Sequence, residues 1–194
     1  MKKYNSQELL EQLEADTRQV ILSANYLLAE DPAVLTEQPS PGKWSVAQVI
    51  EHLNSYGRFY LPAMKKTLEQ SQAPAVTYFK PGWFGNYFTK IISPKEGVVP
   101  NKMKTPKDHR PSPDIDSKKV LDEFLAQQKQ LLQLLKNAKQ HDIGKLRTPV
   151  SISKLIKLKL GDTFRFYIGH QQRHMIQAKN TLESLNAKIK LVAL

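Results

Sequence analysis

Hydrophobic residues recur with the 3.6-residue period of an amphipathic helix in four long stretches of this chain. In the first stretch Leu9, Leu13, Val20 and Ala24 form one apolar stripe. No stretch shows the alternation of a β-strand convincingly. The pattern therefore predicts an all-α protein, with helices over about residues 6–29, 46–70, 117–139 and 162–187.

Local signals mark where three of these helices begin or end. Asp31-Pro32 ends the first helix, because proline disfavours the helical conformation of the residue before it. Ser45 and Gln48 have the spacing of a capping box, with which the second helix begins. Asp162 is a good N-cap for the fourth helix.

Residues 73–113 form a long insertion, rich in proline and lysine, between the second and third helices. Its segment 78–88 holds six aromatic residues in eleven positions. A connection of this length is usually functional or has structure of its own. Four amphipathic helices with one long crossover predict a four-helix bundle, and the chain has room for one domain, residues 1–194.

The chain contains no cysteine, which excludes disulfides, thiolate metal sites, iron–sulfur clusters and a cysteine nucleophile. No apolar run approaches the roughly 18 residues of a membrane helix, and the N-terminal residues lack the apolar stretch of a signal peptide. We therefore expect a cytoplasmic protein with no membrane partner.

The charge balance is basic, with 29 Lys and Arg against 18 Asp and Glu and a net charge of +11. Such a balance is typical of proteins that bind nucleic acid or another anion. The basic residues nevertheless gather in predicted loops, and no helix-turn-helix or RNA-binding signature is present. We favour a solvated basic surface, with nucleic acid and an anionic ligand as the alternatives.

Histidine carries the candidate chemistry. His170 and His174 are four residues apart in the fourth helix, so both imidazoles project from one face. His52 lies beside the apolar stripe of the second helix and could meet them inside the bundle. Three imidazoles with an open position suit catalytic zinc, and nickel also accepts imidazole ligands. The alternative is ordinary hydrogen bonding at the edge of the core. His109 and His141 lie in predicted loops and carry little signal.

Two patches resemble the DinB-like superfamily, which includes the YfiT-type thiol transferases. They are Trp44-Ser45 with Glu51-His52-Leu53, and residues 169–174 with Gln177-Ala178. The resemblance implies a four-helix bundle with unusual crossover connectivity, often dimeric, and a divalent metal on His52, His170 and His174. It also implies that a low-molecular-weight thiol could be the co-substrate. The aromatic insertion is not part of the motif, so the resemblance does not define the substrate.

Other residues near the histidines have two interpretations each. Tyr56 lies one turn after His52 and could donate a hydrogen bond to a metal-bound ligand, although core packing is the simpler role. Glu51 could be a base or a partner of His52, but adjacent helix residues diverge by about 100°. We expect Arg173 to point away from the metal and to form a structural salt bridge.

Two expectations concern the rest of the molecule. Segment 78–88 could pack over the open end of the bundle as a lid, or form a dimer contact. The stripes of the first and third helices, with residues 191–194, could bury themselves in a homodimer. The sequence thus predicts a metal-dependent enzyme that activates a thiol or water toward a small electrophile, as a transferase or hydrolase. The alternatives are a non-catalytic ligand-binding or metal-binding protein and, less favoured, a nucleic-acid-binding protein.

Overall fold

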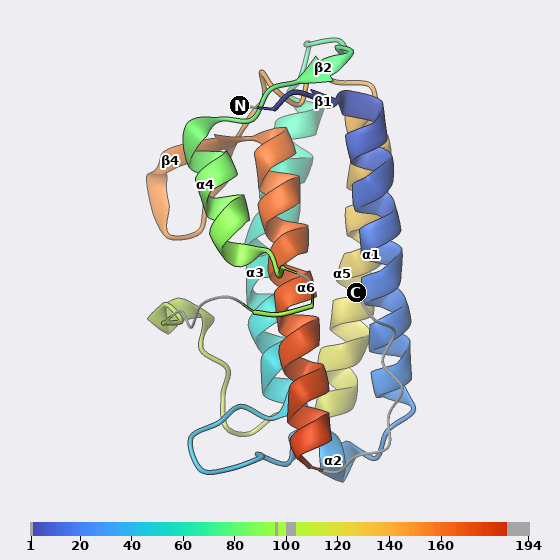
Figure 1. Ribbon diagram of the computed structural model, residues 1–194, viewed down its shortest axis with the longest axis vertical. Helices are drawn as coiled ribbons and strands as arrows, with labels where there is room; N and C mark the ends of the chain where they lie inside the picture. Colours follow the sequence, from blue (N-terminus) through green and yellow to red (C-terminus); the bar gives the residue numbers. More distant parts are fainter. Residues whose placement is uncertain (1, 96, 100–103, 186–194) are drawn as a thin grey trace.

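Four long helices packed side by side dominate the structure, a computed structural model that describes residues 2–95, 97–99 and 104–185 (Figure 1). The predicted four-helix bundle is confirmed, and the helix ends lie within three residues of those expected. The long helices are α1 (Ser6–Leu28), α3 (Val46–Glu69), α5 (Ser117–Ala138) and α6 (Leu160–Ser184).

The order of the helices around the bundle differs from their order in the chain. Both α1 and α3 pack against α5 and α6. The two helices that come first in the sequence therefore lie diagonally opposite each other. This is the crossover connectivity that the resemblance implies, and it places α3 beside α6, where the candidate histidines can meet.

Side-chain caps begin three of the four long helices. Ser45 and Gln48 form the predicted capping box of α3, in which each side chain bonds the backbone of the other residue. Asn5 caps α1 and Asp116 caps α5. The prediction for α6 is wrong, because this helix begins at Leu160 and Asp162 does not cap it. The Asp162 carboxylate accepts a hydrogen bond from the backbone N–H of Gly82 at 2.7 Å instead.

The insertion has structure of its own. Helix α4 (Trp83–Ile92) packs against α6, and the short η1 (Lys107–His109) lies against α3. Close packing of α4 depends on two glycines, because a Cβ on Gly85 would lie 2.4 Å from Asp162 and one on Gly169 would lie 2.4 Å from Ser93. The remaining helix is α2 (Pro32–Thr36), which precedes α3.

Two small antiparallel sheets accompany the bundle. Strands β1 (Tyr4–Asn5) and β2 (Tyr78–Phe79) pair beside the N-terminus. Strands β3 (Arg147–Val150) and β4 (Ser153–Lys159) form a hairpin that leads directly into α6. The all-α fold class is confirmed, because both sheets are small beside the helices. The sequence pattern did not predict the hairpin.

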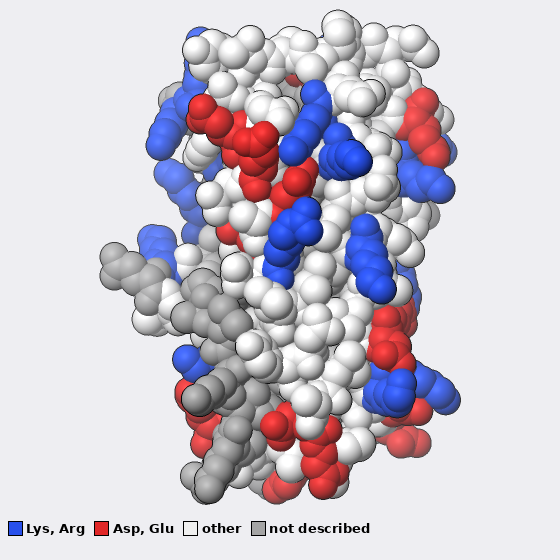
Figure 2. All heavy atoms as spheres, turned by 90° about the vertical axis from the view of Figure 1, so that its right-hand side faces the viewer, with Lys and Arg blue, Asp and Glu red and all other residues white. Residues whose placement is uncertain are grey.

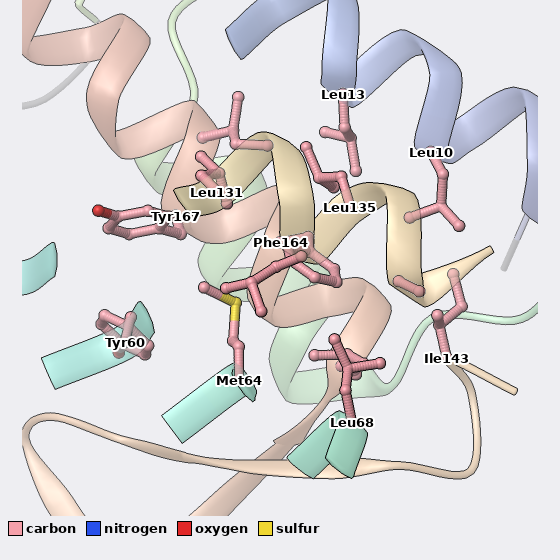
Figure 3. Packing of buried hydrophobic residues seen from close by; sticks show 14 of the residues in the cluster. Leu10, Leu13, Tyr60, Met64, Leu68, Leu131, Leu135, Ile143, Phe164 and Tyr167 are labelled. Atoms are coloured by element: carbon pink, nitrogen blue, oxygen red, sulfur yellow. The ribbon is translucent and has the colours of Figure 1, made fainter. Parts of the chain in front are cut away.

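The apolar core is divided into two clusters by a polar layer. In the first cluster, shown in Figure 3, side chains from all four long helices converge, Leu10, Met64, Leu135 and Phe164 among them. The second cluster lies toward the other end of the bundle, around Phe124. Between the clusters each long helix contributes buried polar residues, namely Thr17, His52, Gln127, Gln128, His170, Gln171 and His174. The candidate site lies in this layer.

The surface around α1 is charged but mixed in sign. Figure 2 shows acidic and basic side chains side by side on this face. The stripes of α1 and α5 are buried inside the bundle, and residues 191–194, which entered the homodimer prediction, lie outside the described residues. None of the helices in the described part of the chain is long and apolar enough to span a bilayer.

Candidate metal centre

His52, His170 and His174 meet in the polar layer between α3 and α6. The Nε2 atom of His170 lies 3.3 Å from Nε2 of His52 and 3.0 Å from Nε2 of His174. All three side chains are buried, and one ligand atom from each lies within 4.8 Å of the others. The structure thus brings together the three histidines that the sequence selected.

Two of the three imidazoles are fixed by hydrogen bonds on their outer nitrogens. Nδ1 of His52 lies 2.7 Å from the backbone carbonyl oxygen of His109. Nδ1 of His174 lies 2.8 Å from Oε1 of Gln177. Because both partners are acceptors, each Nδ1 carries the proton, and each neutral ring then presents the Nε2 lone pair to the centre. Metal-binding histidines are usually held in this way.

The two ring nitrogens of His170 indicate that a cation fits between the three histidines. Its Nδ1 is buried and has no hydrogen-bond partner among the described residues. If His170 carries its proton on Nδ1, the Nε2 lone pairs of all three histidines face one another. If His170 carries its proton on Nε2, this N–H can donate to only one of the two neighbouring Nε2 atoms. Nitrogens bound to tetrahedral zinc at about 2.0–2.1 Å lie roughly 3.3 Å apart. The donor set and its spacing therefore fit a divalent metal ion.

Burial keeps all three imidazoles neutral. Desolvation lowers the pKa of His52 to about 4 and that of His174 to about 3. The pKa of His170 is lowered well below its usual value by desolvation and by the two neighbouring imidazoles. Neutral imidazole is the form that binds metal, so the site is ready to bind at neutral pH.

Tyr56 and His109 form an aromatic wall beside the histidines. The rings of Tyr56 and His109 stack with centroids 3.8 Å apart, and the Tyr56 ring also lies 4.5 Å from that of His170. Ser55 Oγ lies 2.9 Å from Nδ1 of His109. Desolvation raises the pKa of Tyr56 to about 12, so its hydroxyl stays protonated and able to donate at neutral pH.

The centre opens on one large cavity of about 940 Å³. Its walls come from α3, α4, α6, the hairpin and the loops around Trp44 and Lys104. Most of the wall residues are apolar or aromatic, and its ionised groups among the described residues are Lys43, Lys104 and Arg173, all cationic. A cavity of this kind suits a small molecule that carries an apolar part and a negative charge.

Several expectations about neighbouring residues need correction. Glu51 faces the surface, where it pairs with Arg58, and does not approach the histidines. Arg173 does not point away from the site, since it is buried and lines the cavity together with His170 and His174. Within segment 78–88 only Phe88 lines the cavity; Phe79 is buried elsewhere, and Trp83, Phe84 and Tyr87 are exposed. The segment is therefore not a lid as a whole.

Two partners of the ligands were missed by sequence reasoning. Gln177 could have been found, because it lies three residues after His174 on the same helix face. His109 lies in a predicted loop, yet it is buried and its carbonyl oxygen accepts a hydrogen bond from His52 Nδ1. No periodic signal in residues 104–110 indicates this contact, which forms only when the insertion folds back on α3.

Comparison with known proteins agrees with this picture. The sequence model of the DinB superfamily matches residues 7–178. One similar solved structure is YfiT from Bacillus subtilis, described as a probable metal-dependent hydrolase with an unusual four-helix bundle topology. The superposition has a TM-score of 0.56 at 15% sequence identity and covers 94% of this chain and 89% of that one. Among curated proteins, no sequence matches.

Proposed function

This chain belongs to the DinB superfamily, and we propose that it is a metal-dependent enzyme of small-molecule chemistry, with His52, His170 and His174 as the ligands of one divalent ion. One observation carries the proposal: three buried, neutral imidazoles present their Nε2 atoms to one point on the wall of a large cavity. The description of YfiT as a probable metal-dependent hydrolase supports it.

A divalent ion held by three imidazoles lowers the pKa of a bound water or thiol and polarises an electrophile. Zinc and nickel both suit these ligands. Other residues of the chain orient the ligands and supply a hydrogen-bond donor. His109 orients His52 and Gln177 orients His174. The Tyr56 ring packs against His52 and His170, and its protonated hydroxyl can donate a hydrogen bond.

The cavity walls account for substrate binding. Trp44, Phe88 and Phe166 offer apolar contact area, while Arg173 places a positive charge beside the histidines. Because Arg173 is buried, its charge is screened less than a charge on the surface would be. We propose a small electrophile that is attacked either by a low-molecular-weight thiol or by water, in a cytoplasmic homodimer.

The test combines metal analysis with turnover. Purified protein should contain about one equivalent of zinc or nickel and should consume an electrophile, with a thiol in the transferase case and without one in the hydrolase case. Both activities should disappear on chelation and return with metal. Metal-loaded protein that binds small molecules but turns none over would instead support a non-catalytic binding protein.

A further inference from the structure

An exposed apolar surface lies outside the metal centre, on α4 and the tip of the β3–β4 hairpin. Leu155 is 95% exposed and Ile152 is 61% exposed at the hairpin tip. On α4, Trp83, Phe84 and Tyr87 are 67%, 60% and 52% exposed. We call these five residues the α4–hairpin surface. Large side chains gathered in this way mark an interaction site more often than a solvated surface.

The two elements lie next to each other. Figure 1 shows α4 and β4 on the same side of the bundle, and they are in direct contact. Phe88 of α4 and Ile152, Ile156 and Leu158 of the hairpin line the cavity of the metal centre. Ile152 is both exposed and part of the cavity wall, so the α4–hairpin surface borders the cavity.

The charged residues in these two elements and in the segments that flank them are mainly basic. Residues 70–95 and 143–161 contain no Asp or Glu, while residues 80–95 and 145–159 contain eight Lys and Arg. Lys80, Lys90 and Lys157 are exposed. The face around α1 in Figure 2 mixes both signs instead. Lys90 lies on α4 and Lys157 on β4, while Lys80 precedes α4, so exposed basic residues lie in or next to the elements that carry the exposed apolar residues.

We propose that the α4–hairpin surface docks on the surface of an anionic phospholipid bilayer. Tryptophan and tyrosine favour the boundary between headgroups and hydrocarbon, where Leu155 and Ile152 could bury their side chains. Lysines beside such residues are attracted to anionic headgroups. The combination is typical of proteins that lie on a membrane without crossing it. The sequence analysis predicts no membrane partner, because these residues come together on one surface only in the folded chain.

Charge and chemistry favour a lipid surface over two other occupants. A second copy of the chain would place this surface on itself across a twofold axis, so its lysines would repel each other. Duplex DNA would attract the lysines but would leave the aliphatic tip, Ile152 and Leu155, without a matching partner. A bilayer with anionic headgroups satisfies both kinds of residue.

Vesicle sedimentation tests the proposal. The protein should bind phosphatidylcholine vesicles that contain about one-third phosphatidylserine, fail to bind phosphatidylcholine alone, and dissociate at high salt. Ile152→Ser/Leu155→Ser should weaken binding at least about tenfold, because it removes two large apolar groups from the interface. Lys90→Gln/Lys157→Gln should weaken it about fivefold for each lysine removed.

Matched variants on the opposite helices serve as controls. Lys129→Gln/Lys136→Gln makes the same charge change on α5, and Leu22→Ser removes an exposed leucine from α1; both should bind as the wild type does. In a Trp44→Phe background, the emission of Trp83 should shift to shorter wavelength on anionic vesicles.

Four results would overturn the proposal. The first two are that the protein does not bind anionic vesicles, or that the α4–hairpin variants bind them as well as the α1 and α5 control variants do. The third is that the protein forms a dimer that only the α4–hairpin variants dissociate. The fourth is that it binds duplex DNA through this surface but does not bind vesicles.

Discussion

The imidazole of His52 is held by the backbone of His109, whose carbonyl oxygen lies 2.7 Å from Nδ1 although the two residues are 57 positions apart. One residue is a candidate metal ligand in the bundle, and the other ends η1 in the insertion. The bond fixes the proton on Nδ1 and so presents Nε2 to the other two histidines. The insertion thus takes part in building the site.

Replacing a ligand should remove the metal without unfolding the bundle. We expect His174→Ala to lose most of its bound metal, because only two imidazoles remain and the adjacent apolar residues of α6 are unchanged. Metal analysis of the purified protein and circular dichroism measure the two outcomes. His141→Ala, outside the cluster, is the matched control; equal metal content in both variants would contradict the site.

The hydrogen bond from His174 to Gln177 should strengthen metal binding by a measurable amount. Gln177→Ala should weaken metal binding about 10–100-fold, because the imidazole loses the acceptor that sets its tautomer. Gln177→Glu, which restores an acceptor, should recover the affinity. The control is Gln172→Ala on the same helix, for which a competition titration should give the wild-type affinity.

His109 should act through its backbone more than through its ring. His109→Ala keeps the carbonyl that holds His52 and should lower metal affinity less than Gln177→Ala does. It removes the stacking on Tyr56 and should cost roughly 0.5–1.5 kcal/mol of the free energy of unfolding. Denaturant titration measures this cost. A loss of metal as complete as in His174→Ala would contradict the backbone role.

The metal-free protein should lose stability in mild acid. Each imidazole has an ordinary pKa near 6.5 in the unfolded chain, but in the folded chain the pKa of His52 is about 4 and that of His174 about 3. Below pH 6.5 the unfolded chain therefore binds more protons, and the free energy of unfolding falls by up to about 1.4 kcal/mol per pH unit for each imidazole. It should level off only below the folded pKa values.

Chemical denaturation of the chelated protein between pH 7 and pH 4 measures this slope. His52→Gln should reduce the slope, because one fewer imidazole takes up a proton on unfolding. His141→Gln is the comparison variant. A slope that His52→Gln leaves unchanged would show that the acid sensitivity arises elsewhere.

Helix α4 should depend on the absence of a side chain at Gly85. A Cβ there would lie 2.4 Å from Cβ and Cγ of Asp162, so Gly85→Ala must push α4 away from α6. Overpacking of this kind typically costs 1–3 kcal/mol, which denaturant unfolding would detect. Lys90→Ala, on the exposed side of the same helix, should change the free energy of unfolding by less than about 0.5 kcal/mol.

The sequence by itself determined the bundle and pointed to the three histidines of the candidate metal centre. Apolar periodicity located four helices to within three residues, because each must bury one face. The spacing of His170 and His174 placed both imidazoles on one face of α6, since one helical turn is a local property. The capping box at Ser45 was equally local and equally visible.

Only the tertiary structure decided what surrounds the ligands. That α3 lies beside α6, and that His109 returns from the insertion to hold His52, depend on contacts between distant residues. Arg173 likewise lines the cavity only because of how the elements pack. The Asp162 carboxylate accepts from Gly82 at the start of α4 and does not cap α6. Hydrophobic periodicity identifies which face of a helix is buried, but the packing of whole elements selects the partner that buries it.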